Sequence, residues 1–267
     1  MTQLHDVVFI VCSSCCGHAT LWRFNSATRQ QLEQITLPLR APTDIAACEL
    51  TSQLYIAYNK CRDRHGNGSA EHHVCRVSED GADIRDWLAQ PMTYNIHTIS
   101  VTSGRLLVTT RWQLLQLDAG GNEMRRICLS DDVDACHAVE SPKGTFIVNH
   151  RIRQVSESIR SESQWQVSEV NTEGRVLRHF TSSRLLLIGC GEHMAVDSHG
   201  NVLVVDHNCV LLLDDRLALR RVIIEEHQLS LSDKVPYGVW YVEQAGQLFV
   251  QIGISMSSIL VFDMLHR

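Results

Sequence analysis

One internal repeat constrains the fold of this chain more than any single residue does. An apolar strand, a turn rich in Ser, Gly or Asn, and a second apolar strand recur as PTDIAACELTSQLYIAY, NIHTISVTSGRLLVTTR, ACHAVESPKGTFIVNH, EHMAVDSHGNVLVVDH and PYGVWYVEQAGQLFVQI. The copies are spaced by roughly 48 residues on average, which suits a four-stranded propeller blade and is too long for leucine-rich or ankyrin units. Equivalent positions in the five copies are Asp44, His97, His137, His193 and Gly238.

Further strands follow each pair. Third strands are predicted at His73–Val77, Trp112–Leu117, Trp165–Val170, Val210–Leu213 and Ile259–Phe262. Fourth strands are predicted at Met124–Leu129, Val176–Phe180 and Leu219–Ile224. Polar turns that contain Gly81, Gly121 and Gly174 join third strands to fourth strands, as expected of hairpins.

We therefore predict an all-β fold, a six-bladed β-propeller of four-stranded blades that forms a single domain over residues 1–267. The expected blades cover approximately residues 1–40, 41–90, 91–130, 131–182, 183–226 and 227–267. The first blade is predicted to lack its inner strand and the last blade its outer strand. We expect an irregular or incomplete seam there, whose unpaired strand edges would invite aggregation or partner binding.

Composition fits a globular, non-membrane protein and argues against nucleic-acid binding. Apolar content is 44%, charged content is 20% and the formal net charge is −6, whereas phosphate binding relies on positive charge. No apolar run is long enough for a membrane span, and the N-terminus does not resemble a signal peptide. The ten cysteines form no spaced framework, so we expect reduced thiols and a cytoplasmic location.

The segment EHMAVDSHGNVLVVDHNCVLLLDDRLALRRVI resembles an NHL repeat. Its Asp197, Gly200, Asn201 and Asp206 match the turn and strand-end pattern of that family one by one, whereas the other copies are degenerate. The resemblance implies a six-bladed propeller that commonly serves as a protein-binding or RNA-binding platform. Because of the net charge and the lack of a basic and aromatic surface run, a protein or peptide partner is favoured over RNA.

Two polar insertions are expected between second and third strands, at Lys60–His72 and His150–Ser163. Loops at this point of a blade emerge on the face where the inner strands begin, and binding residues often lie on such loops. This face is the predicted partner surface. Its candidate residues are Asp44, Arg62, Arg64, His65, His150, Arg151 and Arg153.

The histidines at the starts of inner strands suggest a second kind of site. Because inner strands line the channel of a propeller, His97, His137 and His193, with Asp44 nearby, would converge on its axis and could hold zinc or another divalent metal. The arrangement resembles that of the peptidyl-hydroxyglycine amidating lyase, a propeller enzyme whose zinc is held by one His from each of three blades. The alternative is that these polar side chains satisfy backbone groups or channel water.

No motif selects a catalytic mechanism. The CxxC in Cys12–Cys16 lacks the second pair that a zinc knuckle needs, and no GxSxG, HExxH or P-loop occurs. Two hypotheses follow. The first is a non-catalytic recognition or scaffold propeller that binds a protein or peptide on the channel-entrance face. The second is a metal-dependent propeller enzyme of the lyase or hydrolase kind, or a metal binder, that uses the channel histidines.

Overall fold

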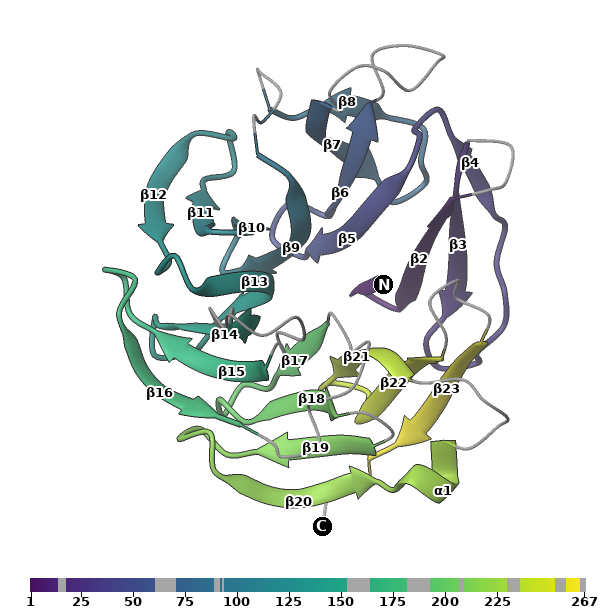
Figure 1. Cartoon of the computed structure of the whole chain (residues 1–267). Coiled ribbons are helices and arrows are strands. Elements are labelled where there is room, and N and C mark those ends of the chain that lie inside the picture. Colours follow the sequence, from purple (N-terminus) through teal and green to yellow (C-terminus); the bar gives the residue numbers. More distant parts are fainter. Residues whose placement is uncertain are drawn as a thin grey trace, which may run out of the picture. The chain divides into compact units, whose positions relative to one another are not determined.

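The computed structural model describes residues 1–13, 18–60, 71–88, 92, 94–152, 164–181, 193–206, 209–229, 236–252 and 258–264. The chain divides into two compact units, Met1–Arg126 and Ile127–Arg267. Six antiparallel sheets occupy the six predicted blade intervals, and we number them blades 1 to 6 (Figure 1).

The first unit holds blades 1 to 3, each a sheet of four strands in chain order. Blade 3 ends at Cys128, just beyond the boundary between the units. The strands are β1 (Thr2–Leu4), β2 (Val7–Ser13), β3 (Ala19–Asn25), β4 (Ile35–Leu37), β5 (Pro42–Cys48), β6 (Gln53–Lys60), β7 (Glu71–Ser78), β8 (Ile84–Asp86), β9 (Ile96–Thr102), β10 (Arg105–Thr110), β11 (Gln113–Leu117) and β12 (Glu123–Cys128).

The second unit holds blades 4 and 5, with four strands each, and blade 6, with three. Its strands are β13 (Val133–Glu140), β14 (Phe146–Ile152), β15 (Gln164–Val170), β16 (Val176–Phe180), β17 (Met194–Val196), β18 (Val202–Asp206), β19 (Cys209–Leu213), β20 (Leu219–Ile224), β21 (Pro236–Val242), β22 (Gln247–Ile252) and β23 (Ser258–Asp263). The short helix α1 (Glu226–Leu229) follows β20. It is the single helix in the described ranges, and it is far too short to cross a membrane.

Two expectations about the strands were wrong. Blade 1 has an inner strand, because β1 pairs with β2 from Thr2↔Phe9 to Leu4↔Val7. The two insertions are also shorter than predicted, because β14 continues to Ile152 and β7 already begins at Glu71. In the described residues, the sheet of blade 6 contains β21, β22 and β23.

The core lies between neighbouring sheets within each unit, and the two-residue period of the strands supplies it. In β6, Ile56 belongs to a cluster shared with blade 1, whereas the adjacent Tyr55 and Ala57 belong to a cluster shared with blade 3. In β18, Val204 packs toward blade 4 and Val205 packs toward blade 6. Second strands are therefore apolar on both faces, as expected for a strand covered on both sides.

Asp and Asn side chains close several of the tight turns. Asp197 Oδ1 accepts hydrogen bonds from the N–H groups of His199 (3.0 Å) and Asn201 (2.7 Å), and Gly200 has a φ of 85°. Asp118, Asn171 and Asp214 make equivalent bonds in turns between third and fourth strands. An Asx side chain followed by a residue at positive φ is the local reason for these turns.

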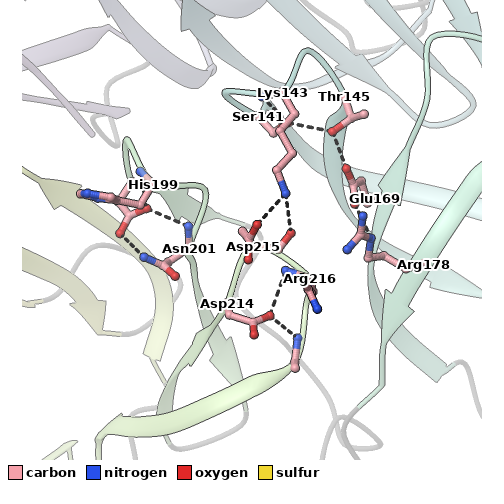
Figure 2. A network of polar contacts seen from close by, with 12 residues as sticks. Ser141, Lys143, Thr145, Glu169, Arg178, His199, Asn201, Asp214, Asp215 and Arg216 are labelled. Atoms are coloured by element: carbon pink, nitrogen blue, oxygen red, sulfur yellow. Dashed lines mark hydrogen bonds and ion pairs between the residues drawn. The ribbon is translucent and has the colours of Figure 1, made fainter.

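Polar contacts also join the turns of blades 4 and 5 (Figure 2). Lys143 Nζ, in the turn between β13 and β14, lies 2.6 Å from Asp215 Oδ2, in the turn between β19 and β20. Within blade 4, the buried Glu169 accepts a 2.7 Å hydrogen bond from Thr145 Oγ1 and pairs with Arg178 Nε at 2.6 Å. The exposed Lys143–Asp215 pair contributes at most about 1 kcal/mol, whereas the partners of Glu169 offset the cost of burying a charge.

Two turn glycines in the second unit form a matched pair for mutation. Both have positive φ, 83° at Gly174 and 75° at Gly144. A Cβ at Gly174 would clash with the carbonyl oxygen of Cys128, whereas a Cβ at Gly144 would meet nothing within 4 Å. We expect Gly144→Ala to lower the free energy of unfolding by about 1 kcal/mol, because of its φ alone. Gly174→Ala should cost about 2 kcal/mol more.

Urea unfolding monitored by tryptophan fluorescence would measure both variants. Equal losses in the two alanine variants would contradict the clash at Gly174.

Candidate functional site

The sequence-predicted residues of the metal site lie in or directly before the inner strands, two in each unit. Asp44 lies in β5 and His97 in β9 of the first unit, whereas His137 lies in β13 and His193 just before β17 of the second unit. Asp44, His137 and His193 are buried, and His97 is half-buried. Their hydrogen bonds show what this repeat position does.

In the first unit, Asp44 links two blades. Its Oδ1 accepts the N–H of Ile45 at 2.8 Å, and its Oδ2 accepts the N–H of Ile99 in β9 at 2.8 Å. Ile99 is on the inner strand of blade 3, where its N–H points away from the sheet. The carboxylate therefore satisfies a backbone donor that β10 does not reach. Charge-assisted bonds of this kind are among the stronger hydrogen bonds.

In the second unit, His137 does the same between blades 4 and 5. Its Nδ1 accepts the N–H of Met194, in the inner strand of blade 5, at 3.2 Å. A neutral imidazole that accepts through Nδ1 carries its proton on Nε2. In that tautomer neither ring nitrogen of His137 offers a lone pair to a metal.

His193 lies between His137 and Trp240 in a row of three tilted rings. The ring centroids are 5.0 Å apart for His137 and His193, and 5.2 Å apart for His193 and Trp240. The backbone of His193 bridges to Gly238, where an added Cβ would lie 3.0 Å from the Trp240 ring. Burial lowers the pKa of His193 to about 3, so its imidazole is neutral at physiological pH.

The metal site stays a prediction. Within each unit, the described side chains include no group of three or more His, Cys, Asp or Glu residues placed to hold a metal ion. The neutral tautomer of His137 and the two engaged oxygens of Asp44 favour the structural alternative for this repeat position.

The predicted partner surface lies partly in the described residues. Arg62, Arg64, His65 and Arg153 fall outside them. His150 and Arg151 lie in β14, where Arg151 stacks over the Trp165 ring at 5.4 Å and contacts Asp134 Oδ2 at 3.4 Å. His150 is buried, and its Nε2 lies 2.8 Å from Ser168 Oγ. His150 therefore belongs to the interior of blade 4.

Exposed aromatic residues at the end of blade 3 were missed by the sequence analysis. The turn from Thr110 to Gln113 is fixed by bonds that Thr110 Oγ1 makes with the N–H (3.1 Å) and the carbonyl (3.0 Å) of Gln113. Its tip presents Trp112, 45% exposed, with the Arg111 guanidinium 5.3 Å from the ring. We refer to Tyr94, Arg111 and Trp112 as the blade 3 tip.

Tyr94 belongs to this tip by register. Ile96 pairs with Thr110, so Tyr94 and Trp112 each lie two residues beyond the same end of the β9–β10 ladder. Tyr94 is 41% exposed. The adjacent Arg111 and Trp112 are the sequence signal for this tip, but the repeat predicts Trp112 as the first residue of the third strand.

Comparisons with known proteins identify the fold. No family model matches the sequence, and a sequence search of curated proteins gives no match. Among solved structures, a protein of unknown function from Bacteroides caccae matches with a TM-score of 0.64 at 14% identity, over 96% of this chain and 89% of that one. The WD40 β-propeller domain of Doa1 matches with a TM-score of 0.58 at 12% identity, over 98% and 93% of the two chains.

The fold is a β-propeller. The predicted fold class is confirmed, with six blades, all antiparallel, of which the last has three described strands. At these identities the likeness shows the propeller architecture alone. Membership of the NHL family stays a prediction.

Buried neutral histidines should make the propeller sensitive to acid. Burial lowers the pKa of His150 to about 4, whereas an unfolded His titrates near its ordinary value of 6.5. Protonation between these values favours the unfolded chain. The contribution of His150 to the free energy of unfolding is thus fully present above about pH 6.5. It falls by about 1.4 kcal/mol per pH unit down to pH 4.

We expect His150→Gln to flatten the fall in unfolding free energy between pH 6.5 and 4.5, measured by urea unfolding. The exposed His227 on α1 provides the control, because His227→Gln should leave the slope unchanged. An identical pH dependence for His150→Gln and the wild type would contradict the buried neutral state of His150.

Proposed function

We propose that this propeller is a non-catalytic recognition scaffold that binds a protein or peptide partner. The single observation that carries the proposal is the blade 3 tip, where Trp112 is exposed beside the Arg111 guanidinium and Tyr94 is exposed at the same end of the β9–β10 ladder. Trp, Tyr and Arg are enriched among the residues that carry most of the binding energy in protein interfaces, and Trp and Tyr offer large contact area with few side-chain torsions to fix.

The location of the tip supports the same proposal. The β10–β11 turn joins a second strand to a third strand, and Tyr94 precedes an inner strand, so both lie on the face where inner strands begin. This is the face on which the sequence places the two insertions. Loops held by a rigid sheet are common sites of recognition.

The engagement of Asp44 and His137 with backbone groups favours recognition over catalysis. Their acceptor atoms bind N–H groups of the next inner strand, which is a structural role. The resemblance of one copy to NHL repeats also supports protein binding. These observations favour a partner that binds at the blade 3 tip over a substrate that binds at the inner strands.

Site-specific photocrosslinking tests this proposal. p-Benzoylphenylalanine would replace Trp112 in one variant and Leu50 in another, and the proteins would be irradiated in extract of the source cells. Leu50 is a matched control, because it is 78% exposed and lies in the turn between β5 and β6. Turns between first and second strands lie at the opposite end of a blade from turns between second and third strands, such as the one with Trp112.

We expect a discrete crosslinked protein from position 112 and none from position 50, and we expect Tyr94→Ala in the first variant to reduce its yield severalfold. Products of equal yield from both positions, or no product from position 112, would contradict recognition through this tip.

A further inference from the structure

Two buried polar atoms lie on the side of blade 2 that faces blade 3. Asn59 Oδ1, near the end of β6, and His72 Nδ1, near the start of β7, are shielded from solvent and make no hydrogen bond within the described residues. His72 is 6% exposed. Because a buried polar atom without a partner costs free energy, a ligand that bonds to both atoms would be stabilised there. We refer to Asn59 and His72 as the blade 2 polar pair.

The β6–β7 register places the two side chains next to each other. Asn59 pairs with His72, and paired residues of an antiparallel ladder project on the same face. The N–H of Asn59 donates to the carbonyl of Ala41 at 3.2 Å, and the carbonyl of His72 accepts the N–H of Met92 at 2.8 Å. These main-chain groups point away from the β6–β7 ladder. The two residues therefore form a non-hydrogen-bonded pair, the kind in which side chains are closer together.

The face that carries the polar pair is the one that packs on blade 3. Ala57 in β6 and Val74 in β7 belong to the cluster shared with blade 3. Asn59 and His72 each lie two residues from one of these, toward the end of the blade where the second strand is joined to the third. The polar pair therefore extends the core cluster outward, to the face on which the blade 3 tip lies.

The chain connects the polar pair to the blade 3 tip. Met92 bridges to His72, and its side chain packs against the same core cluster. Tyr94 follows two residues later. Two residues of extended chain span at most about 7 Å and bridged residues lie about 5 Å apart, so the Cα atoms of Tyr94 and His72 are at most about 12 Å apart. An extended peptide covers that distance with about four residues.

The polar pair carries no charge at physiological pH. Burial, together with the neighbouring His73 and His97, lowers the pKa of His72, so its imidazole is neutral. The adjacent charged residues, Lys60 and Glu71, form the next pair of the ladder and project on the opposite face. The polar pair thus offers hydrogen bonds without an ionic partner.

This chemistry selects among the side chains that a partner could insert. A lysine or arginine would find no carboxylate in the pair and would meet the positive charge of Arg111 in the tip. A carboxylate has no hydrogen to donate to Asn59 Oδ1, and a hydroxyl has only one. A primary carboxamide has two N–H donors and an acceptor oxygen, so it can bond to both atoms of the pair at once.

We propose that the blade 2 polar pair binds the side-chain carboxamide of an asparagine or glutamine in the partner peptide. The carboxamide donates one N–H to Asn59 Oδ1 and bonds to His72 Nδ1, whichever ring nitrogen of the imidazole carries the proton. This inference rests on the proposed function, because the blade 3 tip holds the rest of the peptide. It adds the residue type for which the propeller is specific.

Selection from a random peptide library tests the specificity. Phage-displayed dodecapeptides would be selected on the immobilised full chain, and those that Trp112→Ala no longer binds are tip-dependent. Asn59→Asp turns the amide of the pair into a carboxylate of the same shape, and Asn59→Leu removes its polar atoms. Asn95→Asp is the matched control, because it makes the same change at an exposed position beside Tyr94. Thermal unfolding confirms that each variant is folded.

We expect the tip-dependent peptides of the wild type to share an asparagine or glutamine at one position. Asn59→Asp should change the preference there to lysine or arginine, because a buried carboxylate needs a cationic partner. Asn59→Leu should abolish the preference, and Asn95→Asp should leave it unchanged.

A fluorescein-labelled peptide from this selection gives a second readout that needs no folded variant. Replacing its shared glutamine or asparagine by leucine should lower its affinity for the wild type at least about tenfold in fluorescence anisotropy.

Two results would overturn the inference while recognition at the tip stands. One is a set of tip-dependent peptides without a shared asparagine or glutamine. The other is a preference that persists unchanged in Asn59→Asp and Asn59→Leu, which would assign the polar pair to bound water. The absence of any peptide that depends on Trp112 would instead contradict the proposed function, and this inference with it.

Discussion

Every sheet in this protein has two edge strands, whose outward backbone groups need hydrogen-bond partners. Supplying those partners is the role of several buried polar side chains. Alternate backbone N–H groups on the innermost strand point away from their own sheet, and leaving them unpaired costs free energy. The preceding blade supplies the acceptor in three described cases: Thr2 Oγ1 for the N–H of Ala47, Asp44 Oδ2 for that of Ile99, and His137 Nδ1 for that of Met194. We call these contacts the inner-strand links.

The inner-strand links show which polar residues have a structural role and are therefore not candidates for binding a partner. Polar side chains at the inner strands are engaged with the main chain, and the buried His193 is neutral between His137 and Trp240. Exposed groups suited to binding lie elsewhere, at the blade 3 tip. The outermost strands β4 and β8 are short, and β12, β16 and β20 carry arginines, which are usual means of preventing edge-to-edge pairing.

The repeat predicted much of this fold from sequence, including the bounds of β16 and β20. It missed β1, because three residues before the first apolar run form neither a recognisable turn nor an alternating pattern. It ended β14 too early, because cross-strand pairing, here Ile152 with Gln164, overrides the polar composition of His150 and Arg151. The repeat position of Asp44 and His137 was found, but not its role, since the acceptor and donor are 55 residues apart for Asp44 and Ile99.

Amide hydrogen exchange at Ile99 and Met194 tests the inner-strand links most directly. Both amides should be protected in the wild type. Asp44→Ala should expose Ile99 while Met194 stays protected, and His137→Ala should do the reverse. Each variant then serves as the control for the other. Unchanged protection of Ile99 in Asp44→Ala and of Met194 in His137→Ala, with both variants folded, would contradict a structural role for this repeat position.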